Sequence, residues 1–238
     1  MTQIDIDQNM ILELANTGVI YGHKKSKTHP KMKGFIGAQR NEIEILKPEV
    51  IIRRLEKAIQ FLKEKRASGG IILLVGTNVS AHETIKKMAE AYEFPYVITR
   101  WLGGTLTNWN VMKERIKHFL DLKEKKEKGE LAKYTKKEQV EFSKELEKLR
   151  QKFEGLVAMK KLPDAIFLID PKIHETAVRE AKIINIPVIA LMDTNDDPTG
   201  IEYPIIGNDR AKTSISWIGN KIIEGLREVT GKEVEGEK

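Results

Sequence analysis

Short apolar runs alternate with longer amphipathic segments along this chain, and no other feature restricts its fold as strongly. The apolar runs cover residues 71–75, 95–98, 165–169, 188–191 and 203–206. In the segments between them, apolar residues recur every three or four positions, which is typical of a helix with one buried face. Strands that alternate with helices predict βαβ units, whose strands are parallel. We therefore expect an α/β protein built on a parallel sheet.

Residues 110–161 interrupt this alternation with two long charged segments. Their apolar positions are Met112, Ile116, Phe119 and Leu122 in the first, and Phe142, Leu146, Leu149, Phe153 and Leu156 in the second. Steps of three and four residues indicate the seam of a coiled coil. With a turn within residues 129–135, the segments would pair as an antiparallel hairpin roughly 30 Å long. We expect this hairpin to be inserted into a globular domain formed by residues 1–109 and 162–238.

Positive charge is concentrated in two parts of the chain. The formal net charge is +6, from 41 Lys and Arg and 35 Asp and Glu. Residues 21–40 contain six basic residues and no acid, and residues 113–161 contain 16 basic residues against 10 acids. Clustered lysines indicate a polyanion-binding protein, because each lysine that reaches a phosphate releases condensed counterions. The alternative is a basic surface that is only solvated.

The composition excludes several kinds of protein. Because the chain has no cysteine, it has no disulfide, thiolate metal site or cysteine nucleophile. No apolar run approaches the roughly 18 residues of a membrane span. The sequence does not begin with a basic stretch followed by an apolar one, so we expect no signal peptide and a cytoplasmic location.

The first candidate site is the basic loop, residues 21–33, which has no periodicity. We expect its lysines to neutralise phosphates; they are Lys24, Lys25, Lys27, Lys31 and Lys33. His23 would make a directed contact or order the loop. A mobile segment whose histidines have no role is the alternative.

The second candidate site, residues 100–108, follows the apolar run at 95–98. Arg100 offers a planar set of donors, and Asn108 supplies a short polar group suited to phosphate oxygens. Gly103 and Gly104 let the backbone turn sharply, and Trp101 would pack the junction. A glycine turn at the end of a strand is also an ordinary structural feature.

Aspartates at the ends of the later strands provide the best case for an enzyme. Asp170, Asp193 and Asp197 would lie near the carboxyl edge of the sheet, where they could hold Mg²⁺ for a phosphotransferase. Such residues also form turns, and Asp193 or Asn195 could cap backbone groups or orient Arg100 and Arg210 across the sheet edge. The chain lacks the GxGxxG and P-loop patterns, and a magnesium enzyme does not explain the basic segments. We predict no catalytic activity; a protein-only adaptor is a further alternative.

Longer motifs carry a resemblance to a known family. They are Gly22-His23, Pro30-Lys31-Met32-Lys33, Val75-Gly76-Thr77, Arg100-Trp101-Leu102-Gly103-Gly104, Leu106-Thr107-Asn108, Asp164, Asp170-Pro171-Lys172, Ile186-Pro187-Val188, Asp193-Thr194-Asn195, Asp197-Pro198, Tyr203-Pro204-Ile205 and Gly207-Asn208-Asp209. In order and spacing, over nearly the whole chain, they resemble the bacterial-type small-subunit ribosomal protein two family. The chain departs from the family pattern at Lys27-Thr28-His29, where an aromatic platform is lost, and at Asn78, where relatives often have a lysine.

The resemblance implies a Rossmann-like or flavodoxin-like parallel sheet flanked by helices, with an inserted antiparallel coiled-coil hairpin. It implies a structural constituent of the small ribosomal subunit that acts in translation, without catalytic residues, cofactor or metal. The implied partners are small-subunit (16S) ribosomal RNA and neighbouring ribosomal proteins, including the large RNA-binding ribosomal protein one. It implies neither a membrane partner nor a small-molecule substrate.

The residues and the resemblance together give two sets of candidate site residues. The predicted RNA contacts are His23, Lys24, Lys25, Lys27, Lys31, Lys33, Arg100, Asn108, Lys125, Lys126 and Lys128. The predicted structural junction consists of Trp101, Gly103, Gly104, Asp193 and Asn195.

Overall fold

A five-stranded parallel sheet forms the centre of the computed structural model, which describes residues 7–233 and, for residues 228–233, the backbone alone. Its strands are β4 (Ile72–Val75), β5 (Tyr96–Val97), β6 (Ala165–Ile169), β7 (Val188–Met192) and β8 (Tyr203–Ile206). They lie in the order β5-β4-β6-β7-β8, and every neighbouring pair is parallel. This is the flavodoxin-like order, so the prediction of an α/β fold with a parallel sheet is confirmed.

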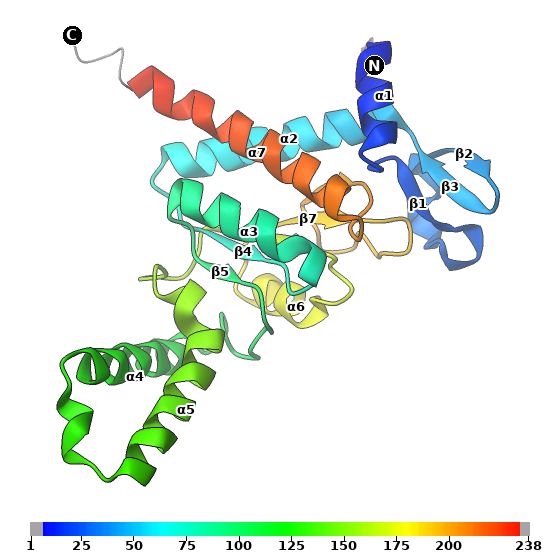
Figure 1. Ribbon diagram of the computed structural model, residues 1–238. Coiled ribbons are helices and arrows are strands. Elements are labelled where there is room, and N and C mark those ends of the chain that lie inside the picture. The colour runs from blue at the N-terminus through cyan, green and yellow to red at the C-terminus, as the bar shows by residue number, and fades with distance from the viewer. Residues whose placement is uncertain (1–6, 234–238) are drawn as a thin grey trace.

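Helices cover both faces of this sheet (Figure 1). The helices are α1 (Gln8–Asn16), α2 (Pro48–Ala67), α3 (Val79–Tyr92), α4 (Trp109–Glu127), α5 (Lys136–Phe153), α6 (Glu175–Ile183) and α7 (Lys212–Glu233). Successive strand residues point to opposite faces. Ile72 and Leu74 therefore pack with α2, α3 and α7, whereas Leu73 and Val75 pack with α6 and with the ends of α4 and α5 nearest the body.

A small antiparallel sheet corrects one prediction. The basic loop was expected to have no regular structure, but its first residues form β1 (Tyr21–Lys24), which pairs with β3 (Ile43–Leu46) and through it with β2 (Ile36–Arg40). Two 3-10 helices, Lys25–Lys27 and Pro30–Phe35, fold much of the remainder. Strands this short give little alternation in the sequence. Their connecting turn places Asn41 and Glu42 at positive φ, without the glycine that usually marks such a hairpin.

Helices α4 and α5, here called the arm, contact each other and extend from the body at the end opposite the small sheet (Figure 1). Helix α5 begins at a capping box in which Thr135 and Glu138 satisfy each other's backbone N–H groups. At the root of the arm, Met112, Ile116 and Phe153 belong to the hydrophobic cluster on the second face of the sheet. The predicted insertion boundaries at 110 and 161 stay a prediction.

The last described element of the chain is the long helix α7. It continues to Glu233, and residues 234–238 lie outside the described part of the chain. Among the described helices, none combines the length and apolar character that a membrane span requires.

Candidate nucleic-acid interface

The basic loop is fixed to the carboxyl edge of the parallel sheet by contacts with a distant segment. The backbone N–H of His29 donates to the carbonyl oxygen of Thr194 at 2.8 Å, and that of His23 donates to the Thr194 hydroxyl at 3.0 Å. A Cβ on Gly22 would lie 2.6 Å from the Thr194 methyl group, so the close approach requires glycine at this position. The loop is therefore part of the folded body.

The side chain of His23 forms the shortest of these links. Its Nδ1 lies 2.6 Å from Oδ2 of Asp193, a carboxylate that also accepts from the N–H of Thr194. The His23 side chain is only 12% exposed and that of Asp193 only 2%. The ring thus orders the loop, which was one of its two predicted roles. A direct RNA contact by His23 stays a prediction.

The loop lysines differ in how their charge is used. Lys31 donates to Asp197 at 3.2 Å and to the hydroxyl of Thr199, and Lys24 lies 3.9 Å from Glu42. The Thr199 hydroxyl and then Lys31 lower the pKa of Asp197 to about 2, so this carboxylate is ionised at neutral pH. The exposed side chains of three lysines form no ion pair within the described part of the chain; they are Lys25, Lys27 and Lys33.

The second candidate segment converges on one carboxylate that the sequence analysis did not single out. Glu180 of α6 accepts hydrogen bonds from the Trp101 indole at 3.0 Å and from the Gly104 N–H at 2.8 Å. Its other oxygen accepts from the N–H groups of Leu106 and Thr107, at 3.0 and 3.3 Å. Two further predicted contact residues of this segment, Arg100 and Asn108, are exposed.

The predicted lysines of the arm also face solvent. Lys125, Lys126 and Lys128 lie at the far end of α4, and all three are exposed. Lys128 pairs with Glu124 at 2.5 Å, one turn earlier. Exposed pairs of this kind contribute little to stability, about 0–1 kcal/mol, and remain open to exchange with another anion.

The predicted structural junction divides into two separate groups. Trp101 and Gly104 bind Glu180, whereas Asp193 binds the basic loop through His23. The side-chain oxygen of Asn195 is buried without a hydrogen-bond partner, and Gly103 is exposed.

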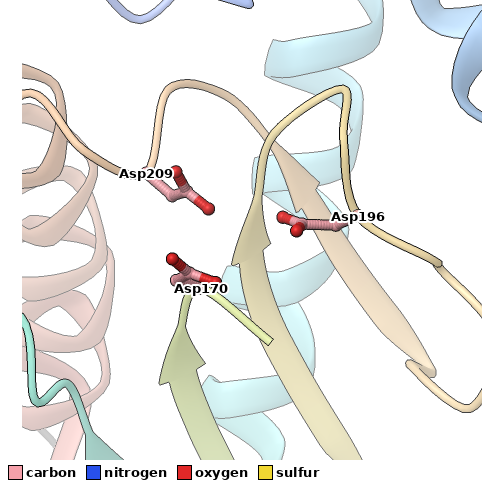
Figure 2. Close-up of side chains that lie close together, drawn as sticks. All are labelled: Asp170, Asp196 and Asp209. Carbon is pink, nitrogen blue, oxygen red and sulfur yellow. The ribbon is translucent and has the colours of Figure 1, made fainter. Parts of the chain in front are cut away.

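Three buried aspartates lie together at the carboxyl edge of the sheet, and they are not the three proposed for a magnesium enzyme. Oxygens of Asp170, Asp196 and Asp209 lie within 4.8 Å of one another, and Figure 2 shows their carboxylates turned toward the space between them. Asp193 is instead engaged by His23, and Asp197 lies half-exposed beside Lys31. The predicted triplet is therefore not brought together.

The environment of these three aspartates favours protonation. Burial, followed by the charge of Asp196, raises the pKa of Asp209 to about 9. Burial also raises the pKa of Asp196 to about 6, although the Asp193 N–H donates to this carboxylate. One oxygen each of Asp196 and Asp209 is buried without a hydrogen-bond partner. Such a group can hold protons or, by its chemistry, offer oxygen ligands to a hard cation.

A buried histidine occupies the point where the strand order reverses, which is the usual ligand crevice of this fold. Nδ1 of His174 lies 2.9 Å from the Asp170 carbonyl oxygen, and Nε2 lies 3.1 Å from the Thr77 hydroxyl. Because the carbonyl can only accept, Nδ1 carries the proton. Burial lowers the pKa of His174, so the neutral ring bridges the loops after β4 and β6.

Sequence reasoning missed Glu180, His174, Asp196 and Asp209 as site residues. One signal was present for Glu180, which shares a helix face with the buried residues Ala177 and Ala181. A charged residue within such a face needs buried partners. No local pattern pointed to His174 or to the pairing of Asp196 with Asp209, because their neighbours come from separate strands.

Comparisons with known proteins identify similar chains. The model of a family described as Ribosomal protein S2 matches residues 14–228. The chain is 42% identical over 225 residues to "Small ribosomal subunit protein uS2" of Dictyoglomus thermophilum, covering 94% of this chain and 91% of the relative. The protein of that name from Dictyoglomus turgidum is 41% identical, with 92% and 89% covered. The one from Fusobacterium nucleatum subsp. nucleatum is 40% identical, with 95% and 94% covered.

Proposed function

Because the chain belongs to the ribosomal protein S2 family, we propose that its loop and arm lysines are the groups that bind ribosomal RNA. The protein is a structural, non-enzymatic constituent of the small ribosomal subunit and acts in translation there, in the cytoplasm. Its partners are small-subunit ribosomal RNA and other ribosomal proteins. A magnesium phosphotransferase and a protein-only adaptor are therefore set aside.

The observation that supports this assignment of residues is the state of the basic loop. Lys25, Lys27 and Lys33 are exposed on a segment whose backbone is held against the body. A lysine on a fixed backbone loses less conformational entropy on binding than one on a mobile tail. The positive charges can therefore meet a preformed RNA surface, and recognition depends on the shape of the RNA backbone more than on its bases.

The test uses small subunits stripped of this protein. We expect the triple variant Lys25→Gln, Lys27→Gln, Lys33→Gln to be retained more weakly than the wild type at moderate salt. The matched control is Lys57→Gln, Lys86→Gln, Lys160→Gln, which removes the same charge from exposed positions elsewhere. Equal losses in the two triples would assign binding to overall charge and contradict the role of the loop.

The arm is also the place where we propose that a protein partner binds, with ribosomal protein one as the candidate. A groove of about 660 Å³ follows the contact between α4 and α5 and is lined by Phe119, Leu120, Leu146 and Val157 among charged residues. Leu120 is 39% exposed, as an apolar contact for a partner would be. Mixed charges at the rim suit a protein better than they suit RNA.

This second proposal has its own matched variants. Leu120→Glu should reduce the retention of ribosomal protein one by reconstituted subunits. Leu162→Glu changes a leucine of similar exposure outside the groove and should leave retention unchanged. Unchanged retention of ribosomal protein one by the Leu120→Glu variant would contradict binding at the groove.

A further inference from the structure

Glu180 stands out among the buried charged groups because it receives five hydrogen bonds from one short segment. The donors are the Trp101 indole, the N–H groups of Gly104, Leu106 and Thr107, and the Thr107 hydroxyl, the last at 3.3 Å. The glutamate is only 6% exposed, and it belongs to α6, about 75 residues further along the chain. No basic side chain donates to it among the described contacts. Its charge is therefore satisfied mainly by backbone N–H groups.

These donors lie where the chain leaves the body to form the arm. Helix α4 begins at Trp109, directly after the bound residues, and the side chain of its N-cap Asn108 makes no capping hydrogen bond. A negative charge near the start of a helix is also favourable for the helix dipole. Glu180 thus supplies from α6 a polar anchor directly before α4, where the N-cap side chain of the arm itself makes no hydrogen bond.

The protonation state of Glu180 agrees with this arrangement. Burial acts to raise the pKa of the carboxyl, but the hydrogen bonds from Leu106, Trp101, Gly104 and Thr107 outweigh burial and hold the pKa below its usual value. The group is therefore ionised at neutral pH, when each of its bonds is charge-assisted.

A second attachment holds the end of α5 nearest the body. The two attachments together can therefore fix the direction of the arm. The hydroxyl of Thr99 donates to the carbonyl oxygen of Gln151 at 2.8 Å, and Gly155 lies against the backbone of Tyr96. One attachment leaves an arm free to pivot, whereas two attachments fix an angle. Of these two polar attachments, the one at Glu180 lies at the start of α4, where Met112 and Ile116 also pack against the body.

We propose that Glu180 is the positioning residue of the arm, fixing the direction in which α4 and α5 leave the body. It acts through the segment 101–107, so Glu180 itself need not touch RNA or protein. If the arm lysines bind RNA, as proposed above, their distance from the basic loop depends on this carboxylate.

The experiment measures arm direction without any partner, so it does not depend on the proposed function. Because the chain has no cysteine, Ser68→Cys on the body and Ser143→Cys on α5 accept two spin labels, and both positions are exposed. Pulsed electron–electron double resonance then gives the distribution of distances between the two labels. We expect one narrow peak for the otherwise unchanged chain. Glu180→Gln should lose that peak, because an amide NH₂ cannot accept from the N–H donors.

The control is Glu175→Gln, which removes the same charge from an exposed position on the same helix and should keep the narrow peak. If Glu180→Gln does not fold, the double variant Trp101→Phe, Thr107→Val takes its place, since it keeps Glu180 and removes two of its five donors. A narrow, unshifted peak in the folded variant would overturn the proposal. Retention on stripped subunits is measured separately: a lost peak with full retention would support positioning and contradict RNA binding by the arm.

Discussion

The basic loop and the arm both present lysines, but they are attached to the body by different forces. Apart from Met32, which is buried in the core, the loop is held by polar contacts across the sequence, of which the pair His23 and Asp193 spans 170 residues. The root of the arm is held by buried apolar side chains, among them Ile116 and Phe153, together with the Glu180 carboxylate. The two regions lie at opposite ends of the molecule (Figure 1).

This difference determines which substitutions should release each region from the body. A loop with few buried apolar groups depends on its polar partners, since a buried group left unsatisfied costs about 1–3 kcal/mol. The arm depends on the packing of its root, because burial of large side chains contributes more. Changes at the sheet edge should therefore release the loop and spare the arm, and changes at the root should do the reverse.

The largest effect is expected at the root of the arm. Phe153→Ala should lower the free energy of unfolding by about 3–5 kcal/mol, because it leaves a cavity where a side chain is only 2% exposed. Val140→Ala, further out on α5 at 52% exposure, should cost less than about 0.5 kcal/mol. Urea denaturation measures both. Similar losses would mean that the root does not differ from the outer arm.

Substitutions of two glycines, one at the root of the arm and one in the basic loop, test the two attachments directly. A Cβ on Gly155 would overlap the backbone carbonyl of Tyr96, whereas one on Gly22 would meet the side chain of Thr194. Because a side chain yields more readily than backbone, Gly155→Ala should cost about 2–3 kcal/mol and Gly22→Ala about 1–2 kcal/mol in thermal unfolding. A larger loss from Gly22→Ala would reverse the comparison.

Asp193→Ala should release the loop. The change removes the carboxylate that binds His23 and the N–H of Thr194, at a cost of about 2 kcal/mol. Trypsin should then cleave at the loop lysines faster than in the wild type, while cleavage within the arm stays at its original rate. Asn9→Ala, at an exposed position, serves as the control for the general effect of mutation. Unchanged cleavage of the loop would show that other contacts hold it.

A change in the pH dependence of stability is expected for the buried aspartates beneath the loop. The pKa of Asp209 is about 9 in the folded chain and near 3.8 when unfolded, so the wild type loses stability as pH rises between these values. Asp209→Asn removes this loss. With a chelator present, the variant should melt above the wild type at pH 8, and the difference should shrink toward pH 5. An advantage that grows as pH falls would contradict the raised pKa.

The sequence predicts the features that lie within one segment of the chain better than those that join distant segments. The strands and helices of the body have strong periodicity, so their order and the parallel sheet could be predicted. The apolar spacing of α4 predicted a buried stripe, and Met112, Ile116, Phe119 and Leu122 are indeed buried. In both cases the signal lies within one segment of the chain.

Features that join distant segments could not be predicted in the same way. The small sheet was missed because its strands are short and its turn lacks glycine. The contact of His23 with Asp193 and the convergence on Glu180 depend on how the sheet brings loops together. The motif residues were visible in the sequence, but their partners were not.

The most direct test of the account is the salt dependence of binding to small subunits stripped of the protein. Affinity is measured over a range of salt for the wild type and for two triple variants. One replaces Lys25, Lys27 and Lys33 with glutamine, and the other replaces Lys125, Lys126 and Lys128.

The slope of log affinity against log salt is negative. If the loop and the arm both meet phosphates, each triple variant should make this slope shallower by about 2, since each phosphate contact contributes about 0.7–0.9. Slopes equal to that of the wild type in both variants would contradict RNA binding by these lysines.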